Sequence, residues 1–182
     1  MLYKGDVNVN KELWGKCVDF HGHECPGLAI GYKVSEAAKE KMGLTFSKDE
    51  EVVCVVENDA CCVDAIQVLT GCSIGKGNLL LKDSGKMAFT FFSRSEDKGV
   101  RIIVKSRKKS EDRQKEMEYI LNASCEELFQ FNKPNFQLPE RARIFTSIVC
   151  EECGEAAAEH KMRLMNGKKV CSDCFKEYTR VF

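Results

Sequence analysis

The chain has 182 residues, which is enough for one sizeable core with a small appendage or for two modest domains. Lys and Arg together number 28, as do Asp and Glu, so the net charge is zero and gives no global preference for nucleic acid. A hydrophobic content of 43% is typical of a globular protein and excludes a disordered chain.

Eleven cysteines are the strongest signal in the composition. Residues 1–6 lack the apolar stretch of a signal peptide, and no apolar run reaches the roughly 20 residues that span a bilayer. We therefore expect a cytoplasmic protein without membrane association, in which thiols stay reduced. Its cysteines are then metal ligands, reactive groups or core residues, and not disulfides.

Two helices are predicted in the first part of the chain. The apolar positions over 10–20 fit a short amphipathic helix, with Asn10 as its N-cap. Those over 26–42 fit a longer helix, and Gly43 supplies its end. The apolar face of the second helix is broad in its first turns, so its N-terminus should lie at the edge of the core.

Three side chains of metal-binding type lie between these helices, namely His21, His23 and Cys25. The histidines are two positions apart, which in an extended segment directs both rings to one side. Pro26 is typical of the first helical position, so Cys25 lies at a helix N-terminus, where the helix dipole favours a thiolate. We predict that these three side chains converge on one metal ion, although a cysteine also packs well as a buried apolar residue.

A second pair of thiols is predicted near another helix N-terminus. The β-branched run over 50–57 indicates a strand buried on both faces, and 58–71 indicates a helix capped by one of its first two residues. Cys61 and Cys62 then lie in the first turn of that helix. Because ligands usually bind beyond the C-terminal ends of strands in open sheets, we expect the two helix N-termini to face each other across one cleft.

The glycine-rich segment 71–78 contains Cys72 and Lys76. A phosphate-binding loop needs four residues between its glycines and a Ser or Thr after its lysine, and this segment has neither. We therefore predict a tight turn, with Lys76 available as an anion contact.

Three more strands are predicted at 78–82, 86–92 and 100–105. The segment 83–85 is typical of a hairpin turn between the first two strands, and 96–99 joins the second to the third. Together with the strand at 50–57, they would form an antiparallel or mixed sheet.

Helices are predicted again after the sheet. Ser110 is the expected N-cap of a helix over 110–122. Ser124 begins another helix, because Glu127 three residues later would complete a capping box. The apolar positions of that helix are Cys125, Leu128, Phe129 and Phe131. The proline-containing stretch 132–139 has no helical period and is predicted to be a linker.

The last part of the chain carries two Cys-x-x-Cys pairs, formed by Cys150, Cys153, Cys171 and Cys174. A unit of fewer than 50 residues with few apolar side chains cannot bury a sufficient core alone. Four thiolates at this spacing are typical of structural zinc. A helix predicted over 172–178 would make this zinc finger a treble clef. We therefore divide the chain into a core domain (1–132), a linker with a lead-in strand (133–149) and a zinc finger (150–182).

Three motifs, taken together and in this order, resemble the E-subunit family of formylmethanofuran dehydrogenase. They are Phe20-His-Gly-His-Glu-Cys-Pro-Gly27, then Glu57-Asn-Asp-Ala-Cys-Cys-Val-Asp64, and then Gly71-Cys72 with Gly75-Lys-Gly-Asn78. The resemblance covers about residues 10–130, and some members carry a similar treble-clef finger. It implies an α+β fold with a thioredoxin-like core, a mixed β-sheet flanked by helices, and a homodimer.

The resemblance also implies a Cys/His active site that holds a metal. Carried over by position, its catalytic residues are His21, Cys25, Cys61, Cys62 and Lys76. Its metal ligands are His21, His23, Cys25 and Cys62. Many members occur outside methanogens, so the family name does not fix a reaction.

Two main functions remain open at this point, and the sequence does not decide whether the chain is an enzyme. In the first, the core domain binds a second zinc or another transition metal and acts on an unidentified small-molecule substrate, with Glu24, Asp59 or Asp64 orienting a histidine ligand. In the second, the chain is an accessory or regulatory protein that senses metal or redox state. Its finger would bind a partner protein or nucleic acid through Lys161, Arg163, Lys168, Lys169, Lys176 and Arg180. An iron–sulfur cluster at Cys54, Cys61, Cys62 and Cys72 is a weaker alternative, because the usual clustered spacings are missing.

Overall fold

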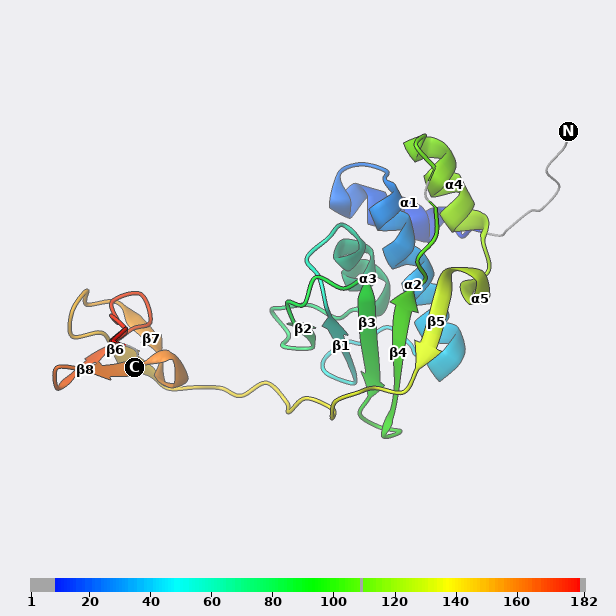
Figure 1. The fold of residues 1–182 in the computed structure, drawn as a ribbon. Coiled ribbons are helices and arrows are strands. Elements are labelled where there is room, and N and C mark those ends of the chain that lie inside the picture. The colour runs from blue at the N-terminus through cyan, green and yellow to red at the C-terminus, as the bar shows by residue number, and fades with distance from the viewer. Residues whose placement is uncertain (1–8, 109, 181–182) are drawn as a thin grey trace, which may run out of the picture. The chain divides into compact units, whose positions relative to one another are not determined.

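The computed structural model describes residues 9–108 and 110–180, and it divides the chain into two compact units, 1–142 and 143–182 (Figure 1). Residues 1–6, on which the expectation of no signal peptide depends, lie outside the described residues. No helix in the described ranges is long and apolar enough to cross a membrane.

A five-stranded mixed sheet is the framework of the larger unit over its described residues, with strand order β2-β1-β3-β4-β5 (Figure 1). The strands are β1 (Val52–Val56), β2 (Leu79–Leu81), β3 (Ala88–Ser93), β4 (Lys98–Val104) and β5 (Phe129–Asn132). β2 runs parallel to β1, and every other neighbouring pair is antiparallel. The predicted α+β class with a mixed sheet and flanking helices is therefore confirmed.

Helices cover one face of this sheet. They are α1 (Lys11–His21), α2 (Pro26–Met42), α3 (Cys62–Thr70), α4 (Arg113–Asn122) and the single turn α5 (Cys125–Leu128). Phe89, Phe91 and Ile102 of the sheet pack with the buried side chains of these helices in one apolar core. The ends of α1 and α2 follow the sequence: Asn10 Oδ1 accepts two backbone N–H groups at 3.1 Å, and Gly43 ends α2 with a φ of 67°.

The chain after β5 covers part of the other face of the sheet. Phe136 packs with Val53, Val55 and Phe92 in a second, smaller apolar cluster that also includes Leu138. The guanidinium of Arg94 donates hydrogen bonds to the carbonyl groups of residues 139 and 140, at 2.9 and 3.0 Å. The first part of the expected linker is therefore packed against the larger unit.

The predicted hairpin between the second and third strands of the sheet is wrong. β1 lies between β2 and β3 and pairs with both of them. All five residues of β1 are buried. A strand that is buried on both faces usually lies between two other strands of its sheet and not at an edge. Residues 83–85 therefore connect two strands that are not neighbours.

The apolar residues after Ser124 also form a different element from the one predicted. Ser124 Oγ accepts the N–H of Glu127 at 3.2 Å, as a cap should, but α5 ends after one turn. Phe129 and Phe131 then belong to β5, which pairs with β4. Their spacing of two places both rings on one face of a strand, whereas in a helix they would diverge.

Two helix starts differ from the prediction. Asp112 caps α4 in place of Ser110, whose hydroxyl instead accepts the N–H of Asp112. The helix predicted from residue 58 begins at Cys62, because Asn58 Oδ1 accepts the N–H of Ala60 and holds the chain in a turn before the helix.

The smaller unit consists of two short antiparallel hairpins and one 3₁₀ turn over its described residues. These elements are β6 (Ser147–Val149), β7 (Ala156–Ala158), η1 (Glu159–Lys161), β8 (Arg163–Met165) and β9 (Lys168–Val170). The helix predicted over 172–178 is absent from the described residues, because the turn after Cys171 closes with one backbone bond from Phe175 N–H and does not continue. The helix that would make this unit a treble clef is therefore not observed in the described residues.

Candidate functional site

The end of α1 and the start of α2 bring the first three candidate residues together. Gly22 has a φ of 89°, a conformation that favours glycine, and it turns the chain directly after His21. Cys25 is the N-cap of α2, with 3% of its surface exposed, and its Sγ accepts the N–H of Leu28 at 3.3 Å. The thiol therefore lies at the N-terminus of α2, as the sequence predicts.

His21 is held in a defined orientation by a residue of α3. Its Nδ1 lies 2.7 Å from Asp64 Oδ2, so the carboxylate accepts from that nitrogen. The other ring nitrogen, Nε2, is then directed to Cys25 Sγ at 3.8 Å. The ring of His23 lies 4.5 Å from that of His21, centroid to centroid. One ligand atom from each of His21, His23 and Cys25 lies within 4.8 Å of the other two, as a shared metal ion requires.

Cys61 lies against the same group from the other helix. A Cβ at Gly27 would be 3.1 Å from Cys61 Cβ, 3.6 Å from Cys61 Sγ and 3.8 Å from Cys25 Sγ. The two thiols thus flank one glycine, and the N-termini of α2 and α3 lie close together, in direct contact and not across the predicted cleft. Burial raises the pKa of the Cys61 thiol, and the neighbouring Cys25 raises it further.

Cys62 is not brought to this group. Its Sγ donates to Asn58 Oδ1 at 3.3 Å inside the core, where the residue has no exposed surface. Burial raises the pKa of this thiol to about 12, so it stays neutral. Of the two adjacent cysteines, Cys61 is the one whose geometry suits a site shared with Cys25.

Lys76 and Cys72 also lie elsewhere. Lys76 Nζ donates to the carbonyl of Ser47 at 2.8 Å and lies over the ring of Phe46. These contacts stabilise the turn that contains Lys76. Cys72 Sγ is buried and donates to the carbonyl of Val52 at 3.6 Å. Within the described residues, two groups of side chains are suited to a metal ion: His21, His23 and Cys25, and the four C-terminal cysteines. The cysteines of the iron–sulfur alternative do not form such a group there.

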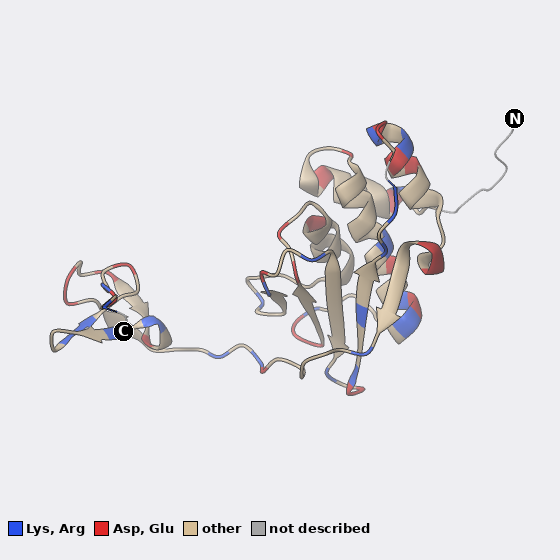
Figure 2. Ribbon diagram, viewed as in Figure 1, with Lys and Arg blue, Asp and Glu red and all other residues tan. Residues whose placement is uncertain are grey.

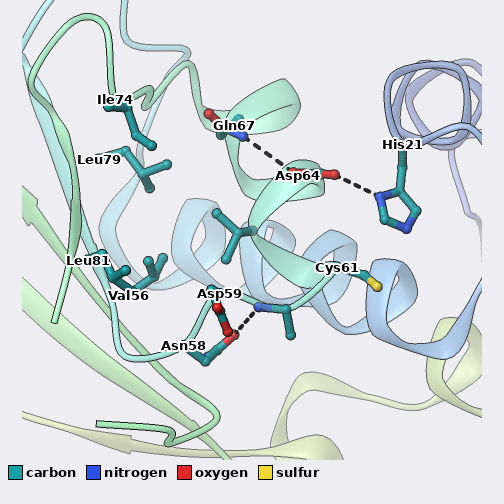
Figure 3. A pocket seen from close by; sticks show the side chains of 12 residues that line it. His21, Val56, Asn58, Asp59, Cys61, Asp64, Gln67, Ile74, Leu79 and Leu81 are labelled. Atoms are coloured by element: carbon teal, nitrogen blue, oxygen red, sulfur yellow. Dashed lines mark hydrogen bonds and ion pairs between the residues drawn. The ribbon is translucent and has the colours of Figure 1, made fainter. Parts of the chain in front are cut away.

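A cavity of about 380 Å³ opens beside His21 and Cys61. Figure 3 shows Asp64 and Cys61 on the side of His21, and apolar side chains such as Leu79 opposite them. Gln67 Nε2 donates to Asp64 Oδ1 at 3.5 Å, so Asp64 is held from two directions. The sequence analysis missed Gln67, although its position three residues after Asp64 on one helix was a usable signal.

The four C-terminal cysteines form the second group. Ligand atoms of Cys150, Cys153, Cys171 and Cys174 all lie within 4.8 Å of one another. Cys153 Sγ and Cys171 Sγ are 4.0 Å apart, close to the roughly 3.8 Å expected for thiolates around tetrahedral zinc. Backbone N–H groups of Cys153 and Cys171 lower the pKa of Cys150 to about 6, because they stabilise its thiolate. This cluster fits a zinc site.

Two family models match the chain, one over each unit. Residues 20–135 match the family described as "FmdE, Molybdenum formylmethanofuran dehydrogenase operon", and residues 143–180 match the "Prokaryotic dksA/traR C4-type zinc finger". A protein from Syntrophus aciditrophicus that is like FmdE, the E subunit of tungsten formylmethanofuran dehydrogenase, is similar in structure. Its TM-score is 0.66 at 20% identity, over 96% of each chain, which shows a shared fold.

An Archaeoglobus fulgidus protein named "Probable S-adenosyl-L-methionine-binding protein" is 30% identical over 195 residues. The match covers 90% of this chain and 52% of that protein, so the chain spans about half the length of this relative.

Proposed function

The chain belongs to the FmdE family and carries a C-terminal four-cysteine zinc site, and on this premise we propose that its larger unit binds a further metal ion and acts there on a small molecule. The proposed ligands are His21, His23 and Cys25, with zinc as the first candidate metal. Cys61 lies beside Cys25, on the other side of Gly27. The homodimer, the cytoplasmic location and the three-domain division stay predictions.

The hydrogen bond from His21 Nδ1 to Asp64 carries this proposal. A histidine that ligates a metal almost always donates its other ring nitrogen to a carboxylate or carbonyl group, which fixes the tautomer. Here the carboxylate leaves the Nε2 lone pair directed towards Cys25. Glu24 does not compete for the role, because it accepts from Trp14 Nε1 at 3.0 Å.

In this proposal, each residue of the site has a separate role. A zinc ion with three protein ligands supplies an open position at which water or substrate is polarised. Cys25 brings its Sγ, which is held at the start of α2, and Asp64 keeps the His21 ring in place. The neighbouring cavity is lined by His21 and Cys61, so a small molecule in it would lie beside these two side chains. The name of the Archaeoglobus fulgidus relative supports a small-molecule ligand for the shared region.

Zinc stoichiometry tests the proposal. We expect two zinc ions per chain in the purified protein and one in the Cys25→Ala and His23→Ala variants, measured by elemental analysis of samples shown to be folded. His23 is exposed, so its loss should leave the fold intact. Cys125→Ala is the matched control, because this thiol is buried away from both groups, and it should keep two ions. A wild-type chain with one zinc, unchanged in both ligand variants, would exclude the core site.

A second candidate function is that of an accessory protein whose finger binds a partner. The observation in its favour is a set of six exposed Lys and Arg side chains, which lie among exposed acidic residues in the smaller unit (Figure 2). Its residues are Lys161, Arg163, Lys168, Lys169, Lys176 and Arg180. The match to a C4 finger family supports this role, and the core site would then sense metal or redox state.

A further inference from the structure

The cavity beside His21 has walls of two kinds. Apolar side chains from β1, β2, α3 and the turn before β2 form one side: Val56, Val63, Ile74, Leu79 and Leu81. In Figure 3 Val56, Ile74, Leu79 and Leu81 lie away from His21, while Asp59 and Asp64 border the same space. Its volume of about 380 Å³ is near the lower end of the range of roughly 300 to 1,000 Å³ for small-molecule sites, so the ligand should be small.

The charges around this space are mostly negative. Asp59 and Asp64 line it, and within the described chain no Lys or Arg does. The start of α3 adds a partial positive charge, but Asp64 lies in its first turn and offsets it. His21 also lines the space, and its Nδ1 is bonded to Asp64. Among the described side chains that line the cavity, a phosphorylated or other anionic ligand would therefore meet two carboxylates and no Lys or Arg.

We propose that this cavity binds a small organic cation, a sulfonium or substituted ammonium compound, with its apolar part on the Val63 and Leu79 side and its charge towards Asp59 and Asp64. The cavity supplies the two things that such a ligand needs, an apolar surface for its body and carboxylates for its head. This inference rests on the proposed function only in placing the cation beside the metal ligands. Binding of the cation itself needs no metal.

Matched six-carbon probes test the charge preference on the full chain with its zinc. Hexyltrimethylammonium and hexyldimethylsulfonium are the two cation sources, hexanol is the neutral probe and hexyl sulfate is the anion. Titration calorimetry or NMR shift mapping should give at least one cation a dissociation constant about tenfold below that of hexanol, with shifts at Val63 and Leu79. The tighter of the two cations identifies the source. Equal affinity for hexyl sulfate, or no preference of either cation over hexanol, overturns the proposal.

The Asp59→Asn variant tests whether the charge of the cation lies near Asp59. This variant should lose roughly fivefold in cation affinity, in line with a partly exposed charge pair, and should bind hexanol as before. Asp97→Asn is the control, because Asp97 lies in the turn between β3 and β4, at the opposite end of the sheet from Val56, and should bind both probes like the wild type. An Asp59→Asn variant with unchanged cation affinity contradicts the assignment.

The same samples separate this proposal from the metal proposal. If the cations bind but the wild-type chain holds one zinc, the metal site is wrong and the cavity assignment stands. If the chain holds two zinc ions and no cation is preferred, the cavity assignment is wrong and the metal site stands.

Discussion

Asp64 is the residue on which the orientation of the candidate metal ligands depends. It comes from α3, whereas His21 and Cys25 belong to the end of α1 and the start of α2. Its two carboxylate oxygens accept from His21 Nδ1 and from Gln67 Nε2, so neither the carboxylate nor the ring can rotate freely. A ring fixed in this way presents Nε2 to a metal without a loss of conformational entropy on binding.

Replacing Asp64 by Asn should therefore weaken the core metal site without removing any ligand. We expect zinc affinity at that site to fall about 10- to 100-fold, the usual effect of losing the partner of a ligating histidine. Competition with a chromogenic chelator measures this. Glu24→Gln is the matched control, because Glu24 is bonded to Trp14, and it should keep the wild-type affinity. Equal losses in the two variants would mean that Asp64 has no special role.

At the scale of elements, the site exists because α2 and α3 approach closely. Gly27 and Gly31 are four residues apart and so lie on one side of α2. The first lies against Cys61, and the second lies against the backbone of Cys62. A Cβ at Gly31 would be 2.0 Å from the Cys62 carbonyl oxygen, closer than any real contact. The absence of two side chains thus lets the start of α3 reach Cys25.

Substitution at Gly31 should disrupt this approach. Gly31→Ala forces α2 and α3 apart, and we expect it to lower the free energy of unfolding by about 3 kcal/mol, as overpacking does in a tight core. Gly15→Ala is the matched control in α1, where a Cβ meets nothing within 4 Å. It should raise stability by up to about 1 kcal/mol, because alanine is the better helix former. Urea unfolding of both variants measures these changes in the free energy of unfolding. A Gly31→Ala variant as stable as the wild type would contradict the packing argument.

At the scale of the whole molecule, the two units have different sources of stability. The larger unit has an apolar core that joins helices and sheet. In the smaller unit, the described buried cluster has three buried members, Cys150, Val170 and Cys171, two of which are zinc-site residues. Binding of zinc is then a large part of the folding free energy of the smaller unit. The exposed charged side chains of the smaller unit are not part of this buried cluster, so they are available for contact with a partner.

If the finger binds nucleic acid, its exposed lysines should set the salt dependence. The full chain would then bind double-stranded DNA at low salt and lose affinity steeply as salt rises, because phosphate contacts release counterions. Replacing Lys168 and Lys169 by Gln should reduce the slope of the logarithm of affinity against that of salt by about 2. Replacing Lys11 and Lys16 of α1 is the control. Binding without salt dependence excludes phosphate contacts, and no binding at all leaves a protein as the partner.

Local features of the fold were predictable because their causes lie within a few residues. The caps at Asn10 and Gly43 and the Cys-x-x-Cys pairs are of this kind. The position of β2 was not predictable, because its strand could pair with either of two neighbours. In the structure it pairs with β1, in parallel, and not with β3.

The group formed by His21, His23 and Cys25 was visible in the sequence by itself, because five residues of chain hold its members close. Only the tertiary structure decided that Cys61 and not Cys62 joins Cys25, and that Asp64, 43 residues after His21, orients the ring. Adjacent residues at the start of a helix point in different directions, and the packing of α2 against α3 selects which one faces the site. The local sequence thus determines the candidate ligands, and helix packing determines which residues lie beside them.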